Sequence, residues 1–225
     1  FLVIYFHNLT KNKKSISGNK IKAPVLLYHN YQFFFYGVFI YVFIFIDRIM
    51  AWSSGINGNL PFLVYFEKNY ELGMDLAILV FLLLAGVLEY SIASFTRFID
   101  IGQKITDHKT PEVFNNQLRK MYWQQVALLF VTSTLAFIFI YFIINASWGF
   151  EGQFNETLVQ LSIKVCVIGG LGYILLAWGM LNSLYLFTLG QSKKPLKAII
   201  YACLLNILLG FVLSRFFAYE YSVVG

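Results

Sequence analysis

The chain has 225 residues, of which 59% are hydrophobic and only 12% are charged, and its mean hydropathy is +0.67. Soluble domains carry about 25% charged residues, so this composition excludes an ordinary soluble domain and indicates a membrane protein. The net charge of +6 does not indicate a nucleic-acid partner, because the basic residues flank apolar segments instead of forming one stripe. They suit the anionic lipids of a cytoplasmic membrane leaflet.

The N-terminal part of the chain predicts the end of one membrane helix and then a polar link. Residues 1–6 are all apolar, and they lack the preceding basic region that a signal peptide requires. We therefore expect them to end a transmembrane helix that starts earlier. Residues 7–30 hold five lysines and predict a cytoplasmic link before the next span.

Five further segments are long and apolar enough to cross a hydrocarbon core about 30 Å thick, which requires roughly 20 residues each. We expect these spans at about residues 32–52, 73–96, 123–144, 160–189 and 196–216. They should be α-helices, because backbone polar groups in lipid must be hydrogen-bonded within the segment. The alternating pattern of a membrane β-barrel is absent, so the predicted fold class is an all-α polytopic bundle.

Basic and acidic residues lie at opposite ends of these spans. Residues 7–30, 97–122 and 190–197 hold thirteen of the seventeen Lys and Arg residues. The loops 53–71 and 147–156 hold one lysine and four glutamates. This is the positive-inside pattern of a multi-pass membrane protein, and all five spans agree with one orientation. The first span is then expected to run outward from the cytoplasm.

Residues 97–122 predict a helical hairpin on the cytoplasmic side. Thr110, Pro111 and Glu112 match an N-cap, a first-turn proline and a first-turn acid, so a helix should begin near residue 111. The preceding helix should extend to about Lys104, with a short turn near Asp107 and His108. The hairpin is either a docking surface for a cytoplasmic partner or a solvated loop. Its candidate docking residues are Lys104, Arg119 and Lys120.

Polar residues inside the spans are candidate functional residues, because an ionisable group in hydrocarbon costs roughly 2.5–3.5 kcal/mol on insertion scales. Asp47 has a short side chain and should face a cavity or pair with a charge on another helix, whereas adjacent Arg48 points elsewhere. Glu89 lies near the inner leaflet, where a cavity role and an interfacial role are both open. Asn182 and Asn206 lie centrally in the last two spans and suit interhelical hydrogen bonds or a transport path.

Other residues near these positions have simpler explanations. Lys164 and Arg215 lie near the outer interface, where long side chains can reach water. Gly169, Gly170, Gly172 and Gly179 permit close helix packing, and a gating hinge is the alternative.

The sequence indicates no catalytic, cofactor or metal site. The three histidines are scattered, and neither cysteine has a nearby histidine or a second cysteine at metal-ligand spacing. A glycine-rich phosphate loop and a paired-acid motif are also absent. We therefore expect a protein that is not an enzyme and that needs no cofactor: a transporter, a pore or a scaffold.

Several short motifs, in this order, resemble a known transporter family. They are Gly37 to Tyr41, then Asp47-Arg48 with Trp52, Asn59 to Leu63, Glu89-Tyr90, Leu118 to Gln125, and Asn206 followed by Ala218 to Tyr221. Together they resemble the PelG-type exopolysaccharide transporters of the multidrug/oligosaccharidyl-lipid/polysaccharide (MOP) exporter superfamily. Arg48 stands where that family usually has lysine.

The resemblance implies a fold of two six-helix bundles around a central cavity. Residues 1–6 would end the sixth helix, residues 7–30 would link the bundles, and residues 31–225 would form the second bundle. The implied location is the bacterial inner membrane. The implied function is export of a Pel-like, amino-sugar-rich polysaccharide or lipid-linked glycan, by alternating access or through a polymer conduit.

The resemblance also implies roles for residues and partners. Residues that would line or gate the cavity are Asp47, Arg48, Glu89, Asn182 and Asn206. A cytoplasmic glycosyltransferase and other membrane subunits of a synthase complex would be the protein partners. Two alternatives stay open: a lipid-linked oligosaccharide flippase or drug exporter of the same superfamily, and a non-transporting scaffold of a polysaccharide synthase.

Overall fold

A computed structural model describes residues 23–54, 67–105, 111–154 and 157–225 of the chain. Within these residues, five helices are long and apolar enough to cross a membrane, which confirms the predicted all-α class and the five spans. The elements are α2 (Ala23–Ser54), α3 (Lys68–Ile105), α4 (Pro111–Asn145), the short α5 (Phe150–Phe154), α6 (Gln160–Thr188), α7 (Lys193–Phe216) and the 3₁₀ helix η2 (Tyr219–Val224).

The helices are longer than the apolar segments that reveal them. α2 begins at Ala23, so residues 23–30 are helical although the sequence assigned them to the link. Pro24 does not oppose this start, because a first-turn proline lacks only an N–H that has no partner within the helix. Residues 1–22, including the predicted end of a preceding helix, lie outside the described residues.

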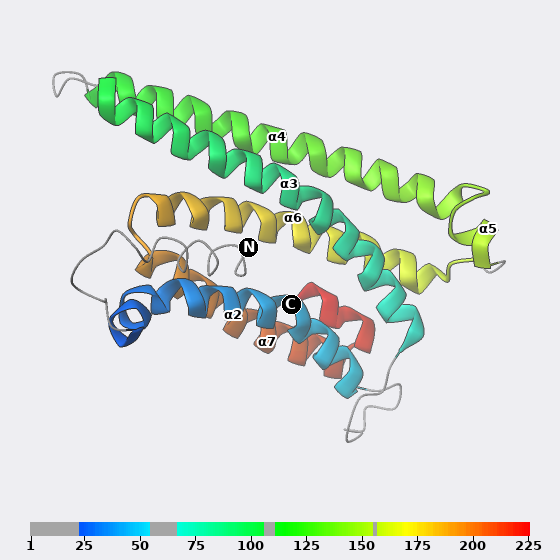
Figure 1. The fold of residues 1–225 in the computed structure, drawn as a ribbon. Helices are drawn as coiled ribbons and strands as arrows, with labels where there is room; N and C mark the ends of the chain where they lie inside the picture. The colour runs from blue at the N-terminus through cyan, green and yellow to red at the C-terminus, as the bar shows by residue number, and fades with distance from the viewer. Residues whose placement is uncertain (1–22, 55–66, 106–110, 155–156) are drawn as a thin grey trace.

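The elements form three neighbouring groups (Figure 1). α3 and α4 make an antiparallel hairpin, α6 lies along α3, and α2 pairs with α7 on the far side of α6. η2 lies among α2, α6 and α7. Successive long helices alternate in direction, which gives the bundle two ends. The Arg48 end holds the helix termini Ser54, Lys68, Asn145, Gln160 and Phe216, and the Lys193 end holds Ala23, Ile105, Pro111, Thr188 and Lys193.

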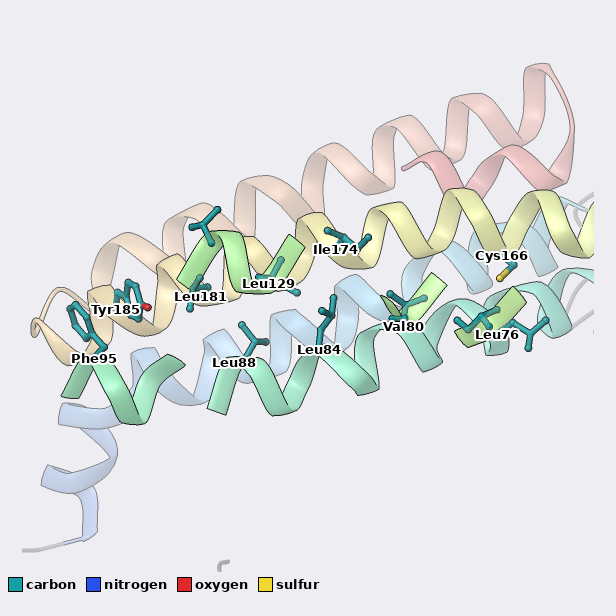
Figure 2. Packing of buried hydrophobic residues seen from close by; sticks show 14 of the residues in the cluster. Leu76, Val80, Leu84, Leu88, Phe95, Leu129, Cys166, Ile174, Leu181 and Tyr185 are labelled. Carbon is teal, nitrogen blue, oxygen red and sulfur yellow. The ribbon is translucent and has the colours of Figure 1, made fainter. Parts of the chain in front are cut away.

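The main core lies between α3 and α6 (Figure 2). Leu76, Val80, Leu84 and Leu88 recur every four residues along α3, so their side chains share one helical face. They pack against residues of α6 and α4, among them Leu181 of α6. In lipid, such contacts stabilise a bundle through close packing rather than through transfer from water.

Small residues allow α3 and α6 to approach closely at the Arg48 end. A Cβ atom added to Gly73 would lie 2.6 Å from the carbonyl oxygen of Ser162. A Cβ on Gly169 would lie 3.2 Å from atoms of Ala77, and the Ser162 hydroxyl donates to the Asn69 carbonyl at 2.7 Å. The interpretation of Gly169 as a packing residue is therefore confirmed.

The α3–α4 hairpin is held together by contacts along its length. The rings of Phe98 and Phe114 stack with centroids 5.4 Å apart. Nearer the bundle, the buried Ser91 hydroxyl donates to the Gln125 Oε1 atom at 2.8 Å. α3 ends at Ile105 and α4 begins at Pro111, which confirms the two predicted helices. The predicted turn near residues 107–108 lies outside the described part of the chain.

Candidate functional site

A cavity of about 350 Å³ lies between the α2–α7 pair and α6. Its wall is mostly apolar and includes the aromatic side chains of Tyr36 and Phe43 from α2. α6 contributes Gly172 and Gly179, and η2 contributes Val223. The remaining lining residues are Ile44, Asp47, Met74, Gly169, Tyr173, Leu175, Leu176, Met180, Ser183, Ala198, Ile199, Ala202, Asn206, Val224 and Gly225.

Three polar groups in this cavity carry its chemistry. Asp47 from α2, Tyr173 from α6 and Asn206 from α7 all line it, and each is at most 8% exposed. The Tyr173 hydroxyl and the Asn206 Oδ1 atom have no hydrogen-bond partner among the described residues. Buried polar atoms are rarely left unpaired, because each one costs about 1–3 kcal/mol. Both atoms are almost completely covered by neighbouring protein atoms, so a ligand or water in the cavity reaches them only when those neighbours move.

The Asp47 carboxyl group has no basic partner within the described residues. It accepts the backbone N–H of Arg48 at 2.8 Å. The Arg48 side chain points away from it, since neighbouring residues on a helix are separated by about 100°. Arg48 binds α3 instead, with Nη1 2.5 Å from Glu71 and Nη2 3.0 Å from Asp75. The predicted divergence of Asp47 and Arg48 is thus confirmed.

The Arg48 contacts form a clamp between α2 and α3 at the Arg48 end of the bundle. Besides the two ion pairs, Trp52 of α2 donates its indole N–H to Glu71 Oε1 at 2.6 Å. The side chains of Arg48 and Glu71 are only 10% and 6% exposed. Glu71 and Asp75 are four residues apart, so both lie on one face of α3 and can reach a single guanidinium. We call Arg48, Trp52, Glu71 and Asp75 the Arg48 clamp.

η2 lines the cavity and is held by contacts at the same end. The buried Ser222 hydroxyl donates to the Tyr70 hydroxyl at 3.0 Å, and Tyr219 donates to Glu67 Oε1 at 3.3 Å. Burial, followed by the charge of Glu67, raises the pKa of Tyr219 to about 12, so this hydroxyl stays a donor even at alkaline pH. Lys164 adds an ion pair to Glu220 at 2.6 Å. These contacts hold the polypeptide after α7 against the cavity wall.

The α6 glycines divide into two kinds. Gly169 and Gly170 are packed, and a Cβ on Gly170 would lie 2.7 Å from the Phe137 ring. Gly172 and Gly179 have nothing within 4 Å of an added Cβ and face the cavity. Their missing side chains therefore leave open space in the cavity wall.

Only some of the predicted site residues line the cavity. Asp47 and Asn206 lie together in the cavity. Arg48 lies in the clamp, outside the cavity wall. Asn182 is half-buried on α6 but does not line the cavity. Glu89 is exposed on α3, next to buried Leu88 but rotated out of the core stripe, and it does not line this cavity. Its cavity or interfacial role stays a prediction.

The candidate docking residues lie at the Lys193 end. Arg119 and Lys120 are exposed on α4. Lys104 lies in the last turn of α3, and its side chain is outside the described part of the structure. Their role as a docking surface stays a prediction.

Sequence reasoning missed the α3 half of the clamp. Glu71 was assigned to a loop because the apolar segment begins at about residue 73, yet α3 already begins at Lys68. The signal that could have revealed it is the spacing of Glu71 and Asp75 opposite a buried arginine. Tyr173 gave no signal, because one tyrosine among 15 in an apolar chain is not distinctive.

Within the described residues, no group of three or more His, Cys, Asp or Glu side chains is placed to hold a metal ion. No family model, curated protein or solved structure matches the chain.

Proposed function

We propose that this chain is part of a membrane transporter that exports an amino-sugar-rich exopolysaccharide, as its resemblance to PelG-type transporters implies. The observation that carries the proposal is the Asp47 carboxyl group in a membrane-depth cavity without a basic partner among the described residues. Ionisable groups at this depth are costly and mark substrate or ion paths.

The cavity chemistry suits a sugar that carries amino groups. An ammonium group of the cargo would supply the cation that Asp47 lacks. Sugar hydroxyls would pair with the Tyr173 hydroxyl and the Asn206 Oδ1 atom once the cargo displaces the side chains that cover them. The Tyr36 and Phe43 rings, with Tyr173, offer aromatic surface for the apolar faces of sugar rings. The open positions at Gly172 and Gly179 leave room for such a ring.

In an alternating-access cycle the Arg48 clamp and η2 would form the outer closure. Their ion pairs join α2 to α3, and Glu220 of η2 to Lys164 of α6, all at one end of the cavity. Opening this end to the outside would require these pairs to separate while the cavity stays intact. The positive-inside pattern assigns this end to the outer face of the membrane.

A flippase or drug exporter of the same superfamily is the second candidate. The observation that favours it is the largely apolar cavity wall, which suits an amphipathic cargo with a cationic group. A non-transporting scaffold is the alternative of another class, and it would give no functional reason for an unpaired buried carboxyl group.

Export of cell-surface polysaccharide by cells that carry Asp47→Asn tests the proposal. The substitution keeps the size of the side chain and removes its charge, so we expect normal membrane levels and a loss of export. Asp100→Asn is the matched control, because Asp100 is exposed on α3 and lies outside the cavity wall. Normal export by Asp47→Asn would overturn the proposal. Normal polysaccharide export with impaired efflux of cationic amphiphiles would favour the drug exporter.

A further inference from the structure

A second hollow lies at the Lys193 end of the bundle, between the third turn of α2 and the turn that joins α6 to α7. Its volume is about 650 Å³. Tyr31, Gln32 and Phe33 line it from α2, and residues 190–194 line it from the turn and the start of α7. We call this hollow the Lys193 groove.

The Lys193 groove carries positive charge without an internal counter-charge. Lys193 and Lys194 line it with exposed side chains, and Lys197 is exposed one turn further along α7. Among the residues that the structure describes, no acid lines the groove and no ion pair engages these lysines. An anion in the groove would therefore be attracted by at least two cations and repelled by no carboxylate among the described lining residues.

The walls of the groove are held in place by contacts of their own. The Ser192 hydroxyl donates to the Oε1 atom of buried Gln32, which ties the turn to α2. Gly190 has a φ of 73°, a conformation that favours glycine and allows the tight turn. Phe33 packs on Phe187 with ring centroids 4.8 Å apart. A preformed groove loses less conformational freedom when it binds a ligand.

The position of the groove favours a lipid over a soluble anion. Tyr31 and Phe33 line it and are 41% and 45% exposed, and such aromatic side chains concentrate at the headgroup level of membranes. The candidate membrane spans of α2 and α7 begin at Asn30 and Lys193, so a groove between these starts should open at the membrane surface. The positive-inside rule assigns this surface to the cytoplasmic leaflet, where anionic lipids gather.

We propose that the Lys193 groove binds the phosphate headgroup of an anionic lipid of the cytoplasmic leaflet, with Lys193 and Lys194 as its charge partners. The proposal depends on the orientation of the chain in the membrane and does not depend on which cargo the cavity takes.

Native mass spectrometry of the purified protein tests this site. The protein is taken from nanodiscs of phosphatidylcholine that contain a minor fraction of phosphatidylglycerol, and retained phosphatidylglycerol is counted. We expect the double variant Lys193→Gln/Lys194→Gln to lose this lipid roughly tenfold, and each single variant to lose it severalfold. Arg97→Gln is the matched control for the single variants, because Arg97 is exposed on α3 outside the groove.

Two results would overturn the proposal. If Arg97→Gln lowers lipid retention as much as Lys194→Gln does, the protein attracts anionic lipid only through its general surface charge. If inorganic phosphate, added to the protein in lipid-free detergent, binds saturably and loses this binding in the double variant, the groove is a site for a soluble phosphate. Retention that depends on Lys193 and Lys194 without such phosphate binding supports the lipid site.

Discussion

Charged side chains are paired at one end of the bundle and exposed at the other. At the Arg48 end, Arg48 pairs with Glu71 and Asp75, and Lys164 pairs with Glu220. At the Lys193 end, Lys193 and Lys194 are exposed and have no ion pair with the described residues. The first arrangement joins helices to one another, whereas the second leaves positive charge available to molecules outside the chain.

This difference separates two uses of charge in one membrane protein. The pairs at the Arg48 end join α2 to α3 and α6 to η2, so their loss should lower stability and, under the proposed function, change transport. Replacement of the lysines at the Lys193 end should change the orientation of the chain in the membrane and its contacts with lipid, with little effect on folding.

The largest effect should come from breaking the Arg48 clamp. Arg48→Met leaves the buried Glu71 carboxylate without its partner, and removing one member of a buried pair costs about 3–5 kcal/mol. We expect a marked loss of thermal stability in detergent. Adding Glu71→Gln to Arg48→Met removes the orphaned charge, so the double variant should regain part of this loss. A double variant less stable than Arg48→Met would contradict the clamp.

The two kinds of α6 glycine should respond differently to leucine. Gly169→Leu forces a side chain into the α3–α6 contact, and overpacking of this kind costs about 1–3 kcal/mol. Gly172→Leu enters open space in the cavity, so we expect normal stability with reduced export. Gly86→Leu is the control, because Gly86 is exposed on α3 with nothing near its added Cβ. Equal melting temperatures for Gly169→Leu and Gly86→Leu would contradict the packing role.

Loss of the hydrogen bond between Ser222 and Tyr70 should have an intermediate effect on stability. Ser222→Ala removes a buried donor at 3.0 Å and should lower stability by about 1 kcal/mol. Hydrogen exchange of residues 219–224 should become faster while exchange in the α3–α6 core stays unchanged. Equal acceleration in both regions would mean that η2 is not an independent closure.

Lys164→Gln should have the smallest effect on stability. Lys164 forms an ion pair with Glu220, and its side chain is 42% exposed. Exposed ion pairs contribute about 0–1 kcal/mol to the free energy of unfolding. A melting temperature near that of the parent protein is expected. A loss as large as that of Arg48→Met would remove the distinction between buried and exposed pairs at this end.

The sequence predicted where the helices lie far better than it predicted which of their faces pack inward. Apolar length alone located all five spans, because lipid requires each crossing segment to satisfy its own backbone. Helix ends were less predictable, since α2 and α3 continue beyond the predicted apolar segments to Ala23 and Lys68. Apolar length reports the thickness of the membrane and not the length of the helix.

The candidate site was only partly predictable, because an apolar segment does not reveal which of its faces packs inward. Asp47 and Asn206 stood out as polar residues in apolar segments, and both line the cavity. Glu89 stood out equally but is exposed, because a helix apolar on most sides does not reveal which side packs inward. Partners that lie far apart in the chain, such as Ser222 and Tyr70, depend on tertiary contacts that no local pattern contains.

Under the proposed function, Asp47 presents its carboxyl group to a cavity that external molecules can enter. Thiol modification of Gly179→Cys, in a background with Cys166 and Cys203 replaced by alanine, tests it most directly. We predict that a cationic thiosulfonate reagent reacts severalfold faster than an anionic one, and that Asp47→Asn removes this preference. Gly86→Cys should show no such dependence on residue 47. Equal rates for both reagents at Gly179→Cys, or a preference that survives Asp47→Asn, would contradict the account.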